Sequence, residues 1–186
     1  MTNSLFFLVR TFFDLYLFVL LLRFLFQFFR VDFYNPFSQF VYKATAPVTM
    51  SVQKILRFLP IEMICLLVLV AFQMIYVTMM HNLVQSMGIG LQDLSLFETL
   101  RLSLTRIFSE LIWLYTLSIF IHALLSWFGA AYYSPIGRLL SDLNEPILKP
   151  IRKMLPLSSG LDFSPLIALI ILNAIRVGIS LPSYLL

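Results

Sequence analysis

Charged side chains are scarce in this sequence. Only 12% of its 186 residues are Asp, Glu, Lys or Arg, against about 25% in soluble domains, and 60% are hydrophobic. This balance excludes an ordinary soluble domain and is that of a membrane protein. The net charge of +4 is spread over loops beside apolar runs, with no basic tail or nucleic-acid motif. The expected partners are therefore the lipid bilayer and its anionic headgroups, and no nucleic acid.

Cysteine and histidine are almost absent as well. The chain has one cysteine, Cys65, and two histidines, His81 and His122, far apart in sequence. A disulfide framework is excluded, and neither a metal site nor a cofactor is expected. There is also no Gly-rich phosphate loop and no nucleophile elbow. The sequence therefore predicts a protein that is not an enzyme.

Long apolar runs are what the sequence does have. A bilayer takes about 20 residues to cross, and four runs reach that length, at residues 5–29, 61–80, 107–129 and 163–182. The first has no basic segment before it and no small-residue cleavage site, so it predicts a retained span rather than a signal peptide. We therefore expect an all-α membrane protein with four transmembrane helices.

The two halves of the chain, residues 1–80 and 107–186, look like copies joined by a linker at 81–106. Tyr34-Asn35-Pro36 in the first half matches Tyr133-Ser134-Pro135 in the second, 99 positions further on. A register shared over several positions predicts an internal repeat. Because each half has two expected spans, the repeats are predicted to be parallel.

Between its two spans each half carries an amphipathic segment. Asn35-Pro36 and Ser134-Pro135 are helix starts, an N-cap residue followed by proline at the first helical position. Pro47 and Pro146 are expected to break each segment into a hairpin of two short helices lying in the membrane interface. The basic residues of these segments predict that both segments are cytoplasmic and that both termini lie on the opposite side, which for a bacterial inner membrane is the periplasm.

The most specific motif lies in the segment from residue 145 to 165. Its residues are Glu145, Pro146, Pro150, Arg152, Pro156, Asp162, Ser164 and Pro165. They are similar to the pattern E-P-x-L-x-P-x-R-x-x-x-P, then G-x-D-x-S-P, of the YggT family of small bacterial and chloroplast membrane proteins. The resemblance covers nearly the whole chain as two copies, and the first copy departs from the pattern at Ala46, which replaces the acidic residue. It implies links to cell division, to osmotic or ionic stress tolerance and, in plastids, to cytochrome complex maturation.

The motif has two readings. In the first, Glu145 and Arg152 fix a rigid corner that offers a surface to a partner, while Asp162 caps the helix that begins at Ser164-Pro165. In the second, the whole segment has only a structural role, at the point where the chain re-enters the membrane. The sequence leaves both open.

Polar side chains inside the expected spans form a second set of candidates. They are Arg10, Asp14, Arg23, His122, Asn173 and Arg176. Arg10 and Asp14 are one helical turn apart and can pair with each other. The others either hold helices together through hydrogen bonds or line a polar path between the halves, because an ionisable group in a bilayer is costly unless it is paired or hydrated.

Two functions follow from these readings. The first is a non-enzymatic inner-membrane scaffold or assembly factor that binds other membrane proteins through the motif. The alternative is a small channel or ion-homeostasis component, a homo-oligomer in which Arg23, His122, Asn173 and Arg176 line the path. Four helices alone enclose little lumen, so the channel requires self-association.

Overall fold

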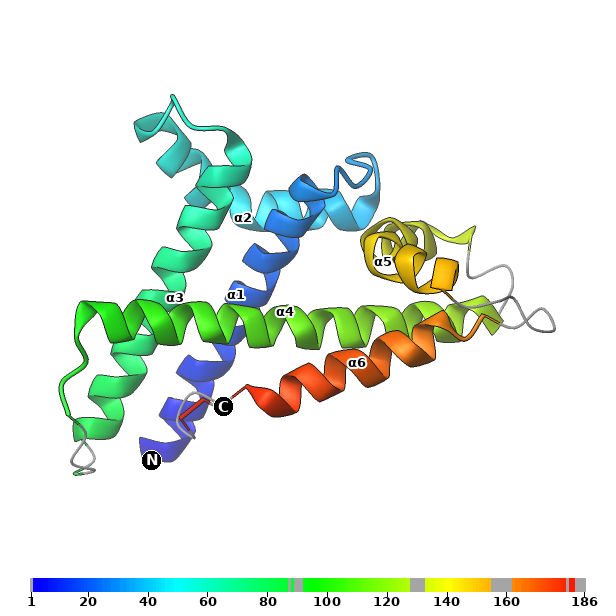
Figure 1. Cartoon of the computed structure of the whole chain (residues 1–186). Helices are drawn as coiled ribbons and strands as arrows, with labels where there is room; N and C mark the ends of the chain where they lie inside the picture. Colours follow the sequence, from blue (N-terminus) through cyan, green and yellow to red (C-terminus); the bar gives the residue numbers. More distant parts are fainter. Residues whose placement is uncertain are drawn as a thin grey trace. The chain divides into compact units, whose positions relative to one another are not determined.

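The structure, a computed structural model, describes residues 2–86, 88, 92–127, 133–154, 162–179 and 181–182, with the backbone alone for residues 2–6 and 127. These residues form six helices (Figure 1). They are α1 (Thr2–Phe28), α2 (Pro36–Ile55), α3 (Ile61–Ser86), α4 (Leu96–Trp127), α5 (Pro135–Met154) and α6 (Ser164–Gly178). No strand occurs in the described part of the chain, so the all-α prediction is confirmed.

Two of the helices, not four, are long and apolar enough to cross a membrane. They are α3 and the segment Leu96–Ser126 of α4. The helix α6 has 15 residues, about 22 Å at 1.5 Å per residue, which is shorter than the hydrocarbon core. The helix α1 has 27 residues and carries Arg10, Asp14 and Arg23 along its length. The described part of the chain thus supports two span candidates rather than the four predicted, and it gives no support to the predicted periplasmic termini.

The connection between the two span candidates is shorter than predicted. The expected linker at 81–106 is helical at both ends, because α3 continues to Ser86 and α4 begins at Leu96. A capping box starts α4: the Ser95 backbone N–H donates to Glu98 Oε2 at 3.0 Å, and the Glu98 N–H donates to Ser95 Oγ at 3.2 Å. The sequence S-x-x-E carries this signal, so the earlier start of α4 could have been predicted.

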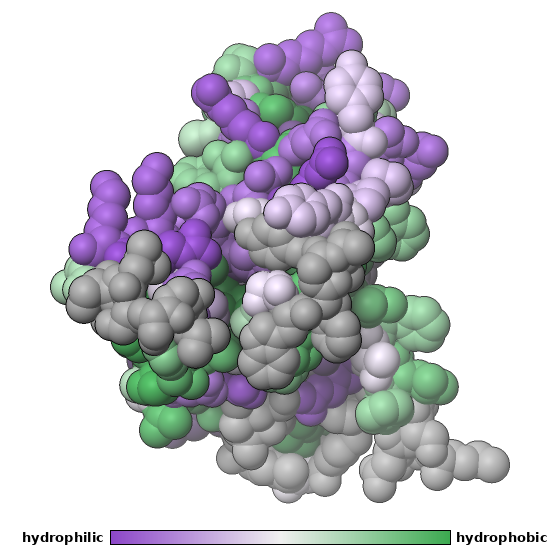
Figure 2. Space-filling model, turned by 90° about the vertical axis from the view of Figure 1, so that its right-hand side faces the viewer, coloured by the Kyte–Doolittle hydropathy of each residue, from purple (hydrophilic) through white to green (hydrophobic). Residues whose placement is uncertain are grey.

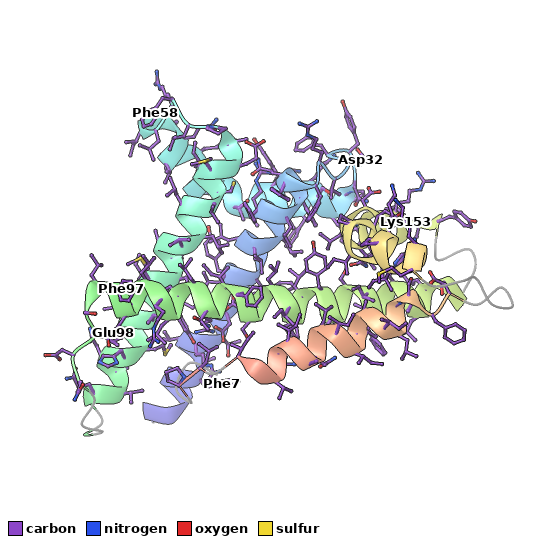
Figure 3. The ribbon with its side chains drawn as sticks, in the orientation of Figure 1. Phe7, Asp32, Phe58, Phe97, Glu98 and Lys153 are labelled. Atoms are coloured by element: carbon purple, nitrogen blue, oxygen red, sulfur yellow. The ribbon has the colours of Figure 1, made fainter. Side chains whose placement is uncertain are left out.

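Large apolar side chains remain exposed on the helices. Leu66, Leu67 and Ile75 of α3 are at least 40% exposed, and Phe7, Phe58 and Phe97 stand out from the ribbon at 65%, 78% and 75% exposure (Figure 3). On the face in Figure 2, many hydrophobic side chains lie at the surface among hydrophilic ones. These exposed apolar side chains and the two apolar helices fit a membrane protein, in which lipid covers the apolar surface.

The prolines do not break α2 and α5. Pro47 lies within α2, and Pro146 and Pro150 lie within α5, each of which is one continuous helix of 20 residues. The predicted break into hairpins of two short helices is wrong. All three prolines are exposed, so the backbone carbonyls that lose their N–H partner lie on the solvated face of the helix.

Both predicted helix starts are confirmed. Asn35 Oδ1 accepts the Phe37 N–H at 3.0 Å at the start of α2, and Ser134 Oγ accepts the Gly137 N–H at 3.2 Å at the start of α5. Asn35 does more than cap its own helix. Its side-chain amide also donates to the Pro135 carbonyl at 2.6 Å, which links the two matching helix starts directly.

The chain forms two compact units, and each draws on both predicted halves. The first unit contains residues 1–24, 41–108 and 181–186. In it α1 packs against α3 through two aromatic pairs, Phe13 with Tyr76 at 5.8 Å and Tyr16 with Phe72 at 5.3 Å between ring centroids. Tyr76 is fully buried, so these pairs lie at the centre of the contact between α1 and α3.

The second unit contains residues 25–40 and 109–180. In it α5 contacts α6, and α5 is amphipathic as predicted, with Leu143 and Leu148 buried and Lys149 and Lys153 exposed. The α4 side chain Ser118 donates to Asn144 Oδ1 of α5 at 2.8 Å, in a fully buried hydrogen bond. A polar contact thus fixes α5 against α4 in the interior of this unit.

Candidate functional site

The motif residues of α5 and α6 meet at one arginine. Arg152 Nη1 contacts Glu145 Oε2 at 3.0 Å, and Arg152 Nε contacts Asp162 Oδ2 at 2.8 Å. We call these three residues the Arg152 clamp. Glu145 lies two turns before Arg152 on the same helix, whereas Asp162 lies just before Phe163, the N-cap of α6. The clamp therefore ties the end of α5 to the beginning of α6 through charge-assisted hydrogen bonds.

The clamp also sets the start of α6. Asp162 Oδ1 accepts the Ser164 N–H at 2.9 Å, and Pro165 lies in the first turn of the helix, where its missing N–H costs nothing. The Asp162 carboxylate thus contacts the backbone at this helix start. Pro146 and Pro150 lie on the exposed side of α5, and Pro156 lies outside the described residues.

The ionisation of the clamp follows from its contacts. Burial alone would raise the pKa of Asp162, but the hydrogen bonds from Ser164 and the Arg152 guanidinium outweigh it and lower this pKa. Burial alone would lower the pKa of Arg152, but the two carboxylates outweigh it and raise that pKa. Both shifts favour the charged forms of Asp162 and Arg152.

We expect the clamp to weaken in acid. The folded-state pKa of Asp162 lies below its value in the unfolded chain, about 3.9, so its contribution to stability is complete above that pH and is lost as the pH falls through the lowered pKa. Melting temperatures of the detergent-solubilised protein between pH 5 and pH 3 will fall more steeply for the wild type than for Asp162→Asn. Equal slopes would show that Asp162 makes no such contribution.

His122 lies close to the clamp. This α4 side chain is 5% exposed, and the charges of Arg152, Glu145 and Asp162 all act on it. From the sequence, His122 was a candidate for the polar path, and the clamp residues were candidates for a partner surface. The structure places His122 near the clamp and thus brings members of these two sets together. A phenotype of His122→Ala alone consequently does not distinguish the two functions.

The other residues of the predicted path have separate environments. The Arg23 guanidinium lies 4.2 Å from the ring centroid of Tyr42, in the first unit. Asn173 is exposed on α6, where its amide donates to the Leu169 carbonyl at 2.8 Å within the same helix. Arg176 is also exposed, near the end of that helix. The described contacts do not join these residues into a path.

Asp14 has a second partner that the sequence did not indicate. Arg10 Nε lies 3.5 Å from Asp14 Oδ2, as predicted from their spacing. In addition, Arg106 of α4 forms an ion pair with Asp14, and its guanidinium lies 3.9 Å from the ring centroid of Tyr76. The side chain of Arg106 is only 6% exposed, so Asp14 and Tyr76 compensate a buried charge.

A metal centre has no support in the described residues. Among them, no group of three or more His, Cys, Asp or Glu side chains could hold a metal ion. Cys65 is a buried cysteine.

Comparison with known proteins decides the family. The family model described as CCB3/YggT matches residues 2–84 and 102–182. The chain belongs to the CCB3/YggT family. The YggT protein of Escherichia coli K12 is 36% identical over 96% of this chain and 90% of its own length. An uncharacterized protein of Pseudomonas aeruginosa is 32% identical over 91% of this chain and 84% of its own.

A third relative, an uncharacterized protein in the proC 3′ region of Vibrio alginolyticus, is 34% identical over 90% of this chain and 89% of its own length. All three relatives carry the description uncharacterized. No solved structure matches the chain. Membership of the CCB3/YggT family thus confirms the resemblance carried by the motif and assigns no reaction.

Proposed function

We propose that this chain is a non-enzymatic inner-membrane scaffold or assembly factor, whose partner surface is the corner made by the Arg152 clamp. The observation that carries the proposal is the double ion pair of Arg152 with Glu145 and Asp162. The side chains of the clamp are 33% to 46% exposed, so a partner can reach them while the ion pairs hold them in place. Pre-organised groups of this kind reduce the entropy cost of binding.

The orientation proposed for the membrane follows from the two candidate spans. Because α2 precedes the first of them and α5 follows the second, both lie on the same side of the bilayer. Both carry exposed basic side chains, among them Lys43, Lys54, Lys149 and Lys153. By the bias of basic residues toward the cytoplasm, this side is cytoplasmic and faces anionic headgroups. The family's links to ionic or osmotic stress and to cell division belong to the same proposal.

The test is crosslinking in cells, followed by purification of the tagged full-length protein and quantitation of what co-purifies. We expect a near-stoichiometric membrane-protein partner whose recovery falls about tenfold or more with Arg152→Ala, since truncating a central interface residue costs 2 kcal/mol or more. The matched control is Lys153→Ala, which removes an adjacent exposed cation outside the clamp and should leave recovery unchanged. Recovery of the protein alone, or equal losses with both variants, would count against the scaffold.

The described contacts support the alternative, a small oligomeric channel, less than they support the scaffold. Its four predicted lining residues divide between exposed positions on α6 and two buried sites in different units. Purified protein that conducts ions in liposomes, with conduction lost in His122→Ala and kept in Arg152→Ala, would favour the channel over the scaffold.

A further inference from the structure

A charged groove lies in the second unit, between the loop after α1 and the exposed side of α5. It consists of two cavities, of about 400 Å³ and about 540 Å³, and Asp32 and Asp142 line both. We call it the Asp32–Asp142 groove. Figure 3 labels Asp32 on the loop and Lys153 on the neighbouring helix α5. Cavities of this size accommodate small polar ligands.

The groove carries charges of both signs. The smaller cavity includes Arg138, and the larger one includes Phe29, Arg30 and Lys149. The ion pairs in the described part of the chain involve none of Asp32, Asp142, Arg30, Arg138 and Lys149. The cations and carboxylates of the groove thus lie near one another without neutralising one another by direct contact.

The two shared carboxylates repel each other. Burial and the charge of Asp32 both raise the pKa of Asp142, burial being the larger cause. In addition, Asp32 Oδ1 accepts the Tyr34 N–H at 2.9 Å, which fixes the position of that carboxylate. A ligand with an ammonium group between Asp32 and Asp142 would relieve the repulsion and supply N–H donors to both.

Arg30 occupies a backbone position that favours glycine. Its N–H donates to the Gln27 carbonyl at 3.2 Å and the Val31 N–H donates to the Phe26 carbonyl at 2.9 Å, which is the Schellman ending of a helix. Arg30 has φ 54° there, in the left-handed region that glycine adopts without cost. An arginine kept at this strained position places a guanidinium at the wall of the larger cavity.

We propose that the Asp32–Asp142 groove binds a phosphoethanolamine group, its ammonium between Asp32 and Asp142 and its phosphate against Arg30 and Lys149. The larger cavity holds both the cations and the carboxylates that such a zwitterion requires. Arginine and lysine both bind phosphate oxygens. A primary ammonium fits better than a quaternary one, because carboxylates accept hydrogen bonds from N–H groups. Phe29 of the larger cavity offers an apolar contact when the group is carried by a lipid.

The proposal does not require the scaffold function, although Glu145 of the clamp also lines the larger cavity. The first experiment measures binding of dihexanoyl-phosphatidylethanolamine to the purified full-length protein in detergent, alongside the phosphatidylglycerol and phosphatidylcholine analogues. We expect the ethanolamine lipid to bind about tenfold more tightly than either analogue, the effect of losing one charge-assisted hydrogen bond. Equal affinity for phosphatidylglycerol would overturn the proposal, because it would reveal only a general attraction of anions.

Variants test the assignment of residues. Arg30→Gly removes the guanidinium and suits the left-handed backbone, so we expect an unchanged or higher melting temperature together with affinity about tenfold lower. Lys149→Ala should weaken binding similarly, while Lys153→Ala, one turn further along α5 and outside both cavities, is the matched control. Full affinity in Arg30→Gly and Lys149→Ala, or equal loss in Lys153→Ala, would overturn the phosphate assignment.

The source of the group is distinguished by soluble O-phosphoethanolamine. If it competes with the short-chain lipid for the groove, the site takes the free ester and the acyl chains contribute little. If only the lipid binds, and Arg30→Gly still weakens that binding about tenfold, the site is a lipid headgroup site. Both results support the groove, whereas no binding of either molecule refutes it.

Discussion

Asp14→Ala will lower the free energy of unfolding by about 3 kcal/mol. The substitution leaves the guanidinium of Arg106, which is 6% exposed, without its carboxylate partner. Removing one member of a buried ion pair typically costs 3 to 5 kcal/mol, and the lower end applies because the Asp14 side chain is 36% exposed. Contact of Arg106 with the Tyr76 ring retains only part of the compensation. The measurement is chemical or thermal unfolding of the protein in detergent.

The matched control for this prediction is Arg10→Ala. Arg10 lies 3.5 Å from the same carboxylate but is 27% exposed, so its loss should cost about 1 kcal/mol or less. The two variants thus separate the ion pair that the sequence indicates from the one that only the fold creates. A larger loss from Arg10→Ala than from Asp14→Ala would show that Arg106 does not depend on Asp14.

Asn35→Ala will lower the free energy of unfolding by about 2 kcal/mol. It removes the N-cap of α2, worth about 1 kcal/mol, and the hydrogen bond from the Asn35 amide to the Pro135 carbonyl, worth about another 1 kcal/mol. Asn35 is 7% exposed, so water does not readily replace these contacts. Thermal unfolding followed by circular dichroism is the measurement.

Ser134→Ala is the control, because Ser134 occupies the matching position 99 residues further on. Its hydroxyl accepts the Gly137 N–H at 3.2 Å as the N-cap of α5. We expect the substitution to lower the free energy of unfolding by about 1 kcal/mol, the usual value of an N-cap. Equal costs for Asn35→Ala and Ser134→Ala would show that the bond to Pro135 contributes nothing to stability.

Local signals in the sequence predicted the fold class and the helix starts. Asn35-Pro36 and Ser134-Pro135 both cap helices where expected, because N-cap chemistry acts over two or three residues. The break at proline was predicted from the same local rule and is wrong. Whether Pro146 breaks a helix depends on which face of α5 is solvated, and that is a property of the tertiary structure.

The candidate site was predicted in part. Glu145, Arg152 and Asp162 were selected from the motif, but their joining into one clamp depends on how α5 turns into α6. Asp14 and Arg106 are 92 positions apart in the sequence, and no spacing rule signals their partnership. The sequence did not predict the Asp32–Asp142 groove for the same reason, because a loop and a helix far apart in sequence form it.

The membership of residues 25–40 in the second unit has a consequence for biosynthesis. This segment packs with residues 109–180, which leave the ribosome long after it. At 5 to 20 residues per second the segment waits roughly 10 to 30 s for its partners. The first unit lacks only its last few residues once position 108 has been made. Asn35 therefore reaches Pro135 as a late step in assembly, and a nascent chain stalled between the two units would expose an uncovered helix start to the cell's chaperones and proteases.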